Sequence, residues 1–395
     1  MPLTCENLME FNLVEKVEKD VVLSPEVMGK FFLLFFEIIG TDKFIKDSPS
    51  FPGSTEKIIR NELVSAIGAT LSIEGTMLDK EEIEESFQKA DQGETLRRKE
   101  QEAENSRQVY AFIRRFVKDH KQGFDYSEPL IKQIHKYFTE NMNYVSNVPG
   151  EYRGDFNVSF GDPRKDSLCR TRGEIQEAMK KFVIWLNTKQ DGFLSSNTFI
   201  KAMMAHYYFT EIHPFVDGNG RTGRALEALI LNANGVNDYC FWSWANFWSA
   251  HKDQYLAYLH NIRMNLNPTN FILWGLEGYK NEIENIKAKV LKKVKQLMFS
   301  DYTHYLLRNK KNEKIKINQR IFDTLQLLIS TGPIPFKKFL STPQVIALYR
   351  SVAESTRVRD FQKMESKDLI KFKKIENEEF IEPNFELLDH LRYTV

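Results

Sequence analysis

The segment HPFVDGNGRTGR, residues 213–224, gathers a histidine, a carboxylate, three glycines and two arginines between two apolar runs. Proline disfavours helical geometry in the residue before it, so Pro214 should place His213 at the end of a helix. The turn that follows, Asp217 to Gly220, is rich in residues that tolerate positive φ, and it leads directly into a second apolar stripe. The amide groups of such a turn, with a helix N-terminus behind them, predict a binding site for an anion.

The charged side chains of this segment indicate which anion is bound. Arg221 and Arg224 are one turn apart on the expected helix, so both guanidinium groups can approach one ligand. That is more positive charge than a carboxylate needs, and it suits a polyphosphate. Asp217 can supply an oxygen ligand to a magnesium ion that bridges phosphates, and His213 can act as a base because its unperturbed pKa lies near neutral pH. Together these residues predict transfer of a phosphorus-containing group to a hydroxyl.

From His213 to Arg224 the sequence resembles the signature of the Fic family, His-Pro-Phe, any residue, Asp or Glu, Gly-Asn-Gly-Arg, two of any residue, Arg. The resemblance implies a mainly α enzyme that transfers AMP from ATP to a Ser, Thr or Tyr hydroxyl of a protein, with Mg²⁺, or alternatively Mn²⁺, as the metal. It implies that His213 is the catalytic base and Asp217 the metal ligand. Arg221 would contact the middle phosphates, and Arg224 the γ-phosphate. The α- and β-phosphates would lie on three consecutive residues, Gly218, Asn219 and Gly220.

A second motif places a carboxylate where helix electrostatics disfavour it. A helix expected over about 56–75 is capped by Gly75, so Glu74 lies at the negative end of the helix dipole. Thr70, Glu74 and Gly75 match the family's inhibitory motif, Ser or Thr, three of any residue, Glu, Gly or Asn. The match implies the class whose inhibitory helix precedes the Fic core. Because Arg224 needs a counter-charge when no γ-phosphate is bound, we expect a Glu74–Arg224 pair that keeps the enzyme inactive.

A metal hydrolase is a rival function for the same residues. His206, His213 and Asp217 could be metal ligands, since the two histidines share one helix face. However, Pro214 separates the last two, and this hypothesis leaves both arginines and the glycine turn unused. We expect His206 to be a core or supporting histidine instead.

The direction of the reaction and its partners stay open at this stage. Some family members with the inhibitory glutamate remove AMP from modified proteins, so a deAMPylating or bifunctional enzyme is an alternative. The target protein, self-modification, the formation of a homodimer and the choice of nucleotide donor are not determined by these motifs.

Amphipathic helices must position these groups, and helical periodicity dominates the chain. Apolar stripes predict helices over 127–142, 173–187, 197–212 and 220–234, in addition to the one over about 56–75. The exception is the segment 152–160, where polar residues alternate with Phe156, Val158 and Phe160. It predicts one strand of a hairpin, and it lies where the family has a flap that binds the target's backbone.

The C-terminal residues predict a separate module. Helices are expected over 315–330, from Thr342 onward and near 354–364, and two short strands follow, which is the order of a winged helix-turn-helix. The third helix carries a modest basic set, Arg357, Arg359 and Lys363. A DNA-binding regulator with a Fic sensor domain is therefore a further alternative, and DNA binding is left open.

The predicted fold is mainly α, with a Fic helical core and small β-hairpin flap, an N-terminal helical region and a C-terminal winged helix-turn-helix-like domain. The expected boundaries are an N-terminal region at 1–110, the Fic core at 111–275, a linker helix at 276–312 and the C-terminal domain at 313–395.

Composition predicts a cytoplasmic protein with no membrane partner. The 55 basic and 54 acidic residues give a net charge of +1, so no general field attracts nucleic acid or an acidic membrane. The N-terminus lacks the features of a signal peptide. The apolar run 31–40 is about half the length that crosses a bilayer, so a buried helix is expected. The three cysteines, Cys5, Cys169 and Cys240, lack paired spacing and are expected to be free thiols.

Overall fold

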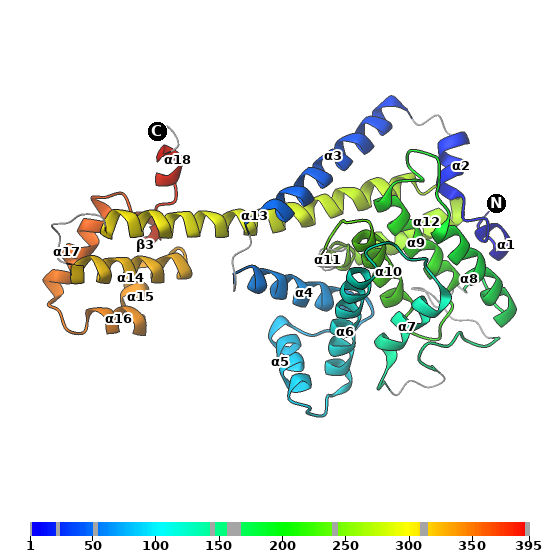
Figure 1. Cartoon of the computed structure of the whole chain (residues 1–395), viewed down its shortest axis with the longest axis horizontal. Coiled ribbons are helices and arrows are strands. Elements are labelled where there is room, and N and C mark those ends of the chain that lie inside the picture. Colours follow the sequence, from blue (N-terminus) through cyan, green and yellow to red (C-terminus); the bar gives the residue numbers. More distant parts are fainter. Residues whose placement is uncertain are drawn as a thin grey trace. The chain divides into compact units, whose positions relative to one another are not determined.

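The computed structural model describes most of the chain, namely residues 2–20, 24–49, 54–142, 147–155, 167–238, 244–308 and 315–391. These residues are largely helical and include one three-stranded antiparallel sheet (Figure 1). They divide into two compact units, Met1–Lys287 and Ala288–Val395. Among the described helices, none is both long enough and apolar enough to cross a membrane. The prediction of a mainly α fold is confirmed.

The described part of the first unit consists of helices alone. In chain order these are α1 (Cys5–Leu8), α2 (Leu13–Asp20), α3 (Pro25–Asp47), α4 (Ser54–Ile73), α5 (Lys80–Asp91), α6 (Arg98–Asp119), α7 (Glu128–Thr139), α8 (Arg172–Asn187), α9 (Thr198–Ile212), α10 (Asn219–Ala233), α11 (Ala245–Ala250), α12 (Lys252–Asn265) and the first part of α13 (Thr269–Arg308). The helices α4, α7, α8, α9 and α10 coincide closely with those that the apolar stripes predict.

Two of these helices, α9 and α10, form the centre of the unit. Helix α10 contacts α4, α6, α7 and α9, and nearly every residue of α9 and α10 is buried. A helix that is apolar or small all round needs such a position. On α9, for example, Met203 and Tyr207 are both 0% exposed. The connection between α9 and α10 is the segment 213–218, so the packing of these helices fixes both of its ends.

Helix α3 corrects one expectation. The apolar run 31–40 was expected to be a buried helix, but only one face of α3 is buried. A helix buries a single stripe against a core, whereas this run places apolar residues on every face. Within the run 31–40, the exposed large apolar side chains are Phe32, Leu33, Phe36 and Ile39.

The second unit packs short helices against the sheet. Its elements are the end of α13, α14 (Ile315–Thr331), β1 (Ile334–Pro335), α15 (Phe336–Leu340), α16 (Pro343–Tyr349), α17 (Glu354–Glu365), β2 (Ile370–Ile375), β3 (Glu378–Pro383) and α18 (Leu387–Leu391). The strand order is β1-β3-β2, and Phe372 of β2 faces Ile381 of β3. Glu376 and Asn377 join these strands at positive φ, as a two-residue hairpin turn requires. The expected order of three helices followed by two strands is present, with β1, α15 and α18 in addition, and the winged helix-turn-helix assignment stays a prediction.

Two expectations remain untested. The alternating residues of the predicted flap, Phe156, Val158 and Phe160, lie outside the described residues, and the described residues 151–155 contain no strand. The division into two units falls inside the expected linker helix 276–312. The finer domain boundaries stay predictions.

Candidate active site

His213 lies at the junction between α9 and the signature turn. It is the C-cap of α9, with φ of 52°, and its backbone N–H donates to the Phe209 carbonyl at 3.0 Å. This left-handed conformation is unusual for a residue with a side chain, and such strain tends to occur at functional sites. Pro214 follows directly and prevents the helix from continuing. The predicted position of His213 at a helix end is present in the structure.

The ring of His213 is held in one tautomer. Its Nδ1 lies 3.2 Å from the Thr210 carbonyl oxygen, which can only accept, so Nδ1 carries the proton and Nε2 the lone pair. The side chain is 7% exposed. Burial, aided by the charge of Arg153, lowers the pKa of His213 to about 4, although Glu74 and Asp217 oppose this shift. At neutral pH the ring is therefore uncharged and able to accept a proton.

Arg153 supports the same turn, and sequence reasoning missed it. Its backbone N–H donates to the Pro214 carbonyl at 2.9 Å, and its Nε donates to the His213 carbonyl at 2.8 Å. The guanidinium also donates to Ser167 Oγ at 2.9 Å and to the Cys169 carbonyl. No local pattern in the sequence separates this arginine from the many others, because each of these partners is 14 or more positions away along the chain.

His135 of α7 supports the turn from the other side. The Gly150 amide donates to its Nδ1 at 2.9 Å, so its Nε2 carries the proton and donates to the Asp217 carbonyl at 2.9 Å. Its ring stacks on Phe215 with centroids 3.6 Å apart and planes at 3°. Burial lowers the pKa of His135 to about 4. A histidine on the apolar stripe of the helix predicted over 127–142 was the available signal for this role.

Protonation of His135 is therefore expected to destabilise the protein. The folded pKa lies below the ordinary value of about 6.5, so the stabilisation is complete above pH 6.5 and is lost as the pH falls toward 4. The shift corresponds to roughly 3 kcal/mol of unfolding free energy. In urea denaturation at pH 7 and pH 4.5, His135→Gln should lose less stability between the two pH values than the wild type. His120→Gln, at an exposed histidine, should keep the wild-type pH dependence, and equal dependence in all three proteins would contradict the role of His135.

The glycine turn has the geometry of an anion site built from backbone. Gly218 is the N-cap of α10 with φ of 76°, and a β-carbon there would lie 3.3 Å from Thr139 Cγ2 and 3.4 Å from His135 Cδ2. The side chain of Asn219 accepts from the Phe215 amide and donates to the Phe215 carbonyl, each at 2.9 Å. Asn219 thus shapes the turn with its side chain, and the amides of the first turn of α10 remain the candidate phosphate donors.

Asp217 of the turn and Arg221 of the first turn of α10 form an ion pair. Arg221 donates to Asp217 Oδ2 at 2.8 Å, and the Asp217 side chain is 39% exposed while that of Arg221 is 4% exposed. The structure therefore places a partly exposed carboxylate and a buried cation, both named by the signature, in contact with each other.

Arg224 meets Glu74 across 150 positions of sequence, as the charge argument predicts. Arg224 donates to Glu74 Oε1 at 2.5 Å, through Nε to Thr70 Oγ1 at 2.7 Å, and to the Thr70 carbonyl at 3.3 Å. Glu74 follows the last residue of α4, and Gly75 adopts φ of 90° directly after it. A β-carbon on Gly220 would clash with the Glu74 carboxylate. That carboxylate therefore lies against the first turn of α10, where an anion was expected.

The local charges stabilise Glu74 in its ionised form. Burial alone would raise the pKa of Glu74, but the charges of Arg224 and Arg221 outweigh burial and hold the pKa below its usual value. The Arg224 side chain is 1% exposed, while that of Glu74 is 33% exposed. The ion pair thus joins a fully buried guanidinium to a carboxylate at the edge of the solvent.

His206 lies behind Arg224 and belongs to a buried polar cluster. Its Nε2 is 2.6 Å from Tyr255 Oη, and its Nδ1 is 2.9 Å from Glu227 Oε1. Both ring nitrogens thus lie next to buried polar groups other than His213 and Asp217. Among the residues that the structure describes, no group of three or more potential ligands could hold a metal ion. The contacts of His206 with Tyr255 and Glu227 fit the expected supporting role.

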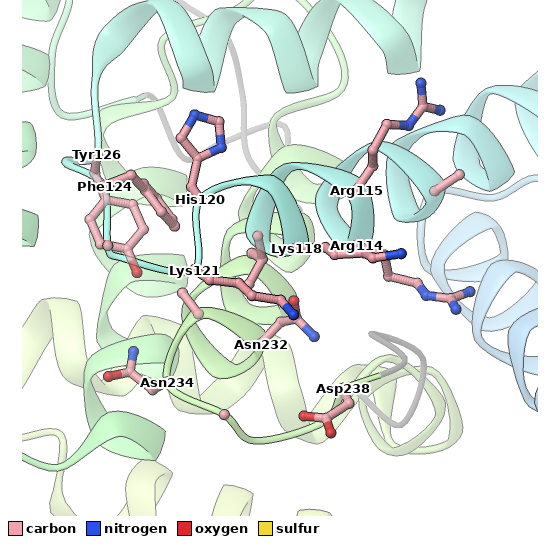
Figure 2. Close-up of a pocket in the computed structure, with 15 residues that line it drawn as sticks. Arg114, Arg115, Lys118, His120, Lys121, Phe124, Tyr126, Asn232, Asn234 and Asp238 are labelled. Atoms are coloured by element: carbon pink, nitrogen blue, oxygen red, sulfur yellow. The ribbon is translucent and has the colours of Figure 1, made fainter.

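A cavity of about 1080 Å³ lies elsewhere in the first unit, at the far end of α10 from the signature (Figure 2). It is formed by the end of α6, the loop after it and the end of α10, and its described lining residues include none of 213–224. The cations that line it are Arg114, Arg115, Lys118 and Lys121. The cavity is thus separate from the predicted nucleotide site.

Comparison with known proteins identifies the segment around this site. Residues 125–231 match the Fic/DOC family. A stretch of 63 residues, 16% of the chain, is 43% identical to protein adenylyltransferase Fic of Drosophila mojavensis and 41% identical to that of Drosophila grimshawi. The matches span only 12% and 13% of the length of those two relatives.

Solved structures with a similar fold cover much more of the chain. A Fic family protein from Desulfovibrio desulfuricans G20 superposes with a TM-score of 0.55 at 16% identity, covering 91% of this chain and 96% of that one. Residues 134–508 of Fic-1 from C. elegans give a TM-score of 0.53 at 19% identity, covering 73% and 84%. At these identities the likeness concerns the fold, and the family match rests on the residues around the signature. Residues 125–231 of this chain therefore form a domain of the Fic/DOC family.

Proposed function

We propose that this chain is a protein adenylyltransferase, which transfers AMP from ATP to the hydroxyl of a serine, threonine or tyrosine side chain of a protein. The observation that carries the proposal is a neutral histidine, His213, placed beside a helix N-terminus that also presents Arg221 and Arg224. The similarity of a short stretch to curated protein adenylyltransferases supports the same reaction.

His213 is proposed as the base of the reaction. The hydroxyl oxygen of the target attacks the α-phosphorus of ATP, the bond from that phosphorus to the β-bridging oxygen breaks, and pyrophosphate leaves. His213 Nε2 accepts the hydroxyl proton, because Nδ1 already donates to the Thr210 carbonyl. Its buried position keeps the ring neutral before the reaction and oriented during it.

The phosphates are proposed to bind at the first turn of α10. Gly218 and Gly220 let a ligand approach the backbone, and the helix N-terminus favours negative charge. Arg221 and Arg224 add two buried cations on the same helix. This much positive charge matches a triphosphate better than a single carboxylate.

The residues at the turn fit a magnesium ion shared with the nucleotide. Asp217 is one carboxylate, partly exposed and held by Arg221 through Oδ2. Mg²⁺ commonly takes one or two protein carboxylates and completes its shell with phosphate and water. When bound there, Mg²⁺ or Mn²⁺ would neutralise charge on the phosphates, and Asp217 would hold it.

Glu74 is proposed to inhibit this reaction in the ligand-free chain. Its carboxylate occupies space against Gly220 and pairs with Arg224, which is the proposed partner of the γ-phosphate. An anion and Glu74 therefore compete for one guanidinium. Nucleotide would bind productively only after Glu74 moves away from Arg224.

Removal of AMP from a modified protein is a second candidate activity. Burial lowers the pKa of His213 and the negative charge of Glu74 opposes this shift, so the two groups share one electrostatic environment. A carboxylate placed there can also orient a water toward a bound phosphorus. A target already labelled with AMP distinguishes the two directions, because hydrolysis should release the label with the wild-type chain and not with Glu74→Gly.

The regulator alternative gains less from the structure. On α17, Arg357 pairs with Glu354 at 2.9 Å, and the neighbouring Asp360 pairs with Arg320 at 2.7 Å. One arginine of this helix thus pairs within the helix, and the helix also carries a carboxylate that pairs with α14, so it is not a strongly basic surface. The C-terminal unit is proposed as a packing or partner-binding module.

ATP labelled at different phosphates tests the proposed reaction. The purified Glu74→Gly variant, incubated with a divalent metal and candidate target proteins, should transfer label from α-³²P-ATP to protein. It should transfer none from γ-³²P-ATP, because the β- and γ-phosphates leave as pyrophosphate. Transfer of label from the γ-phosphate would indicate a kinase. The proposal would be overturned if neither labelled ATP left label on the variant itself or on any protein of a cell extract.

A further inference from the structure

Two of the three cysteines lie side by side, although they are 164 positions apart in sequence. The Sγ atoms of Cys5 and Cys169 are 2.8 Å apart, and both cysteines are free thiols. The expectation of free thiols is met by this pair, but the close contact between the two sulfurs was not predicted. A disulfide bond is about 2.0 Å long, so the two sulfurs need to approach by less than about 1 Å to form one.

Each of the two thiols is held in place by its own segment. The residues before Cys5 are anchored because Leu3, which is 4% exposed, donates its amide to the Arg263 carbonyl at 2.7 Å. Thr4 then caps α1 through a reciprocal hydrogen-bond pair with Asn7. Cys5 thus lies on a folded segment that packs onto the first unit. The Leu3 hydrogen bond and the cap of α1 hold the Cys5 backbone in place near Cys169.

Cys169 is fixed from the opposite side. It is 0% exposed, and its carbonyl accepts hydrogen bonds from the Arg153 guanidinium and from Ser167 Oγ, the latter at 3.1 Å. The same guanidinium donates to the His213 carbonyl at 2.8 Å. Cys169 is therefore linked to the proposed catalytic histidine through a single arginine.

The two thiols are chemically unequal. Cys5 is partly exposed and Cys169 is buried, so an oxidant from solution reaches Cys5 first. The hydrogen bond from the Cys169 thiol lowers the pKa of Cys5, whereas the same bond together with burial raises the pKa of Cys169. Cys5 is thus the better nucleophile, and Cys169 is placed to react second.

We propose that Cys5 and Cys169 are a redox-sensitive pair that a peroxide converts into an intramolecular disulfide. The Cys5 thiolate attacks one peroxide oxygen, the O–O bond breaks, and the departing hydroxide is protonated to water, which leaves a sulfenic acid. The Cys169 sulfur then attacks the Cys5 sulfur, and the hydroxyl leaves with the Cys169 proton as a second water. The two thiols lose two electrons and two protons in total, and one peroxide becomes two waters.

The disulfide would join the N-terminal segment to the segment that contacts Arg153, the arginine that supports His213. It would close a loop from residue 5 to residue 169 and restrain the segment from Ser167 to Cys169, which contacts Arg153. Such a crosslink limits the unfolded chain and is expected to raise the melting temperature by roughly 5 °C. This modification does not depend on the proposed enzymatic activity.

Peptide mapping of the folded full-length chain tests the proposal. After treatment with equimolar hydrogen peroxide and alkylation, a non-reducing digest should contain a crosslinked peptide pair with Cys5 and Cys169, two hydrogens lighter than the sum of its parts. Titration under denaturing conditions should find one of the three thiols left, and a dithiol reductant should restore all three. Cys240→Ser should keep the crosslink, while Cys5→Ser and Cys169→Ser should each abolish it.

Chain denatured before oxidation provides the matched control. There the crosslink should form at least about tenfold more slowly, because the two sulfurs are no longer held together. Three results would each overturn the proposal. They are equal rates of crosslink formation in folded and denatured chain, a disulfide that uses Cys240, and oxidation of Cys5 beyond sulfenic acid while Cys169 keeps its thiol. The wild-type mapping is decisive even if a serine variant fails to fold.

Discussion

AMP transfer by the Glu74→Gly variant is expected to exceed that of the wild-type chain by about 10- to 100-fold at subsaturating ATP. A hydrogen bond between charged groups contributes about 1.5–3 kcal/mol, and each 1.4 kcal/mol corresponds to a factor of ten in rate or population. The bond at issue is the one from Arg224 to Glu74 Oε1, at 2.5 Å. Removing the carboxylate leaves the guanidinium available to the γ-phosphate.

The remaining contacts explain why the change belongs at Glu74 and not at Arg224. Arg224 keeps both hydrogen bonds to Thr70, to Oγ1 and to the carbonyl, when Glu74 is removed. The guanidinium therefore stays in place while its counter-charge is lost. Gly220 also gains room for a ligand, because the Glu74 carboxylate no longer lies against it.

Ligand-dependent stability gives a second readout of the same change. Without nucleotide, Glu74→Gly should melt at a lower temperature than the wild type, since a buried guanidinium has lost its carboxylate. With ATP and Mg²⁺ the variant should gain more stability than the wild type, as tighter binding to the folded state requires.

Two further variants control the experiment. Glu74→Gln keeps the size of the side chain and an acceptor oxygen without the charge, so an intermediate rate is expected. Glu56→Gly removes the same charge from an exposed position near the start of α4 and should leave the rate unchanged. A Glu74→Gly variant no more active than Glu56→Gly would contradict the inhibitory role.

Local sequence patterns were sufficient for the elements that carry the proposed chemistry. The apolar stripes predicted α4, α9 and α10 because each helix buries a face whose period is visible in the sequence. The contact between Glu74 and Arg224 was also predictable, since a carboxylate at a helix C-terminus and an arginine without a counter-ion each need a partner.

The supports of the turn could not be predicted, because they depend on how distant segments pack. Arg153 reaches the His213 carbonyl across 60 positions, and His135 reaches the Asp217 carbonyl across 82. Arg153 does not differ locally from other arginines, and the place of His135 on an apolar stripe does not indicate which residue it contacts. The sulfur contact between Cys5 and Cys169 is a similar case, since sequence spacing alone cannot indicate a pair separated by most of the first unit.

The largest loss of activity is expected for His213→Ala, measured in the Glu74→Gly background so that the starting rate is high. General-base catalysis contributes about 10²- to 10⁴-fold, and the variant should lose a factor in this range in kcat. Its stabilisation by ATP should persist, because the amides of α10, Arg221 and Arg224 are retained. Loss of both activity and ATP-dependent stabilisation would instead indicate damage to the fold.

The pH dependence of kcat/KM distinguishes a buried base from an ordinary histidine. The pKa of His213 is lowered to about 4 by burial, and the Glu74 charge, which opposes the shift, is absent from the Glu74→Gly variant. The neutral ring should therefore predominate from pH 8 down to pH 5.5. As a result, kcat/KM should not drop to half its maximum near pH 6.5, the ordinary pKa of histidine. If kcat/KM falls with a midpoint near pH 6.5, and substitution of no other histidine removes that midpoint, then His213 lies in a solvated environment. If His213→Ala keeps its rate, then His213 is not the base. The two measurements thus test separately that His213 is buried and neutral, as its Thr210 contact indicates, and that its Nε2 accepts the proton.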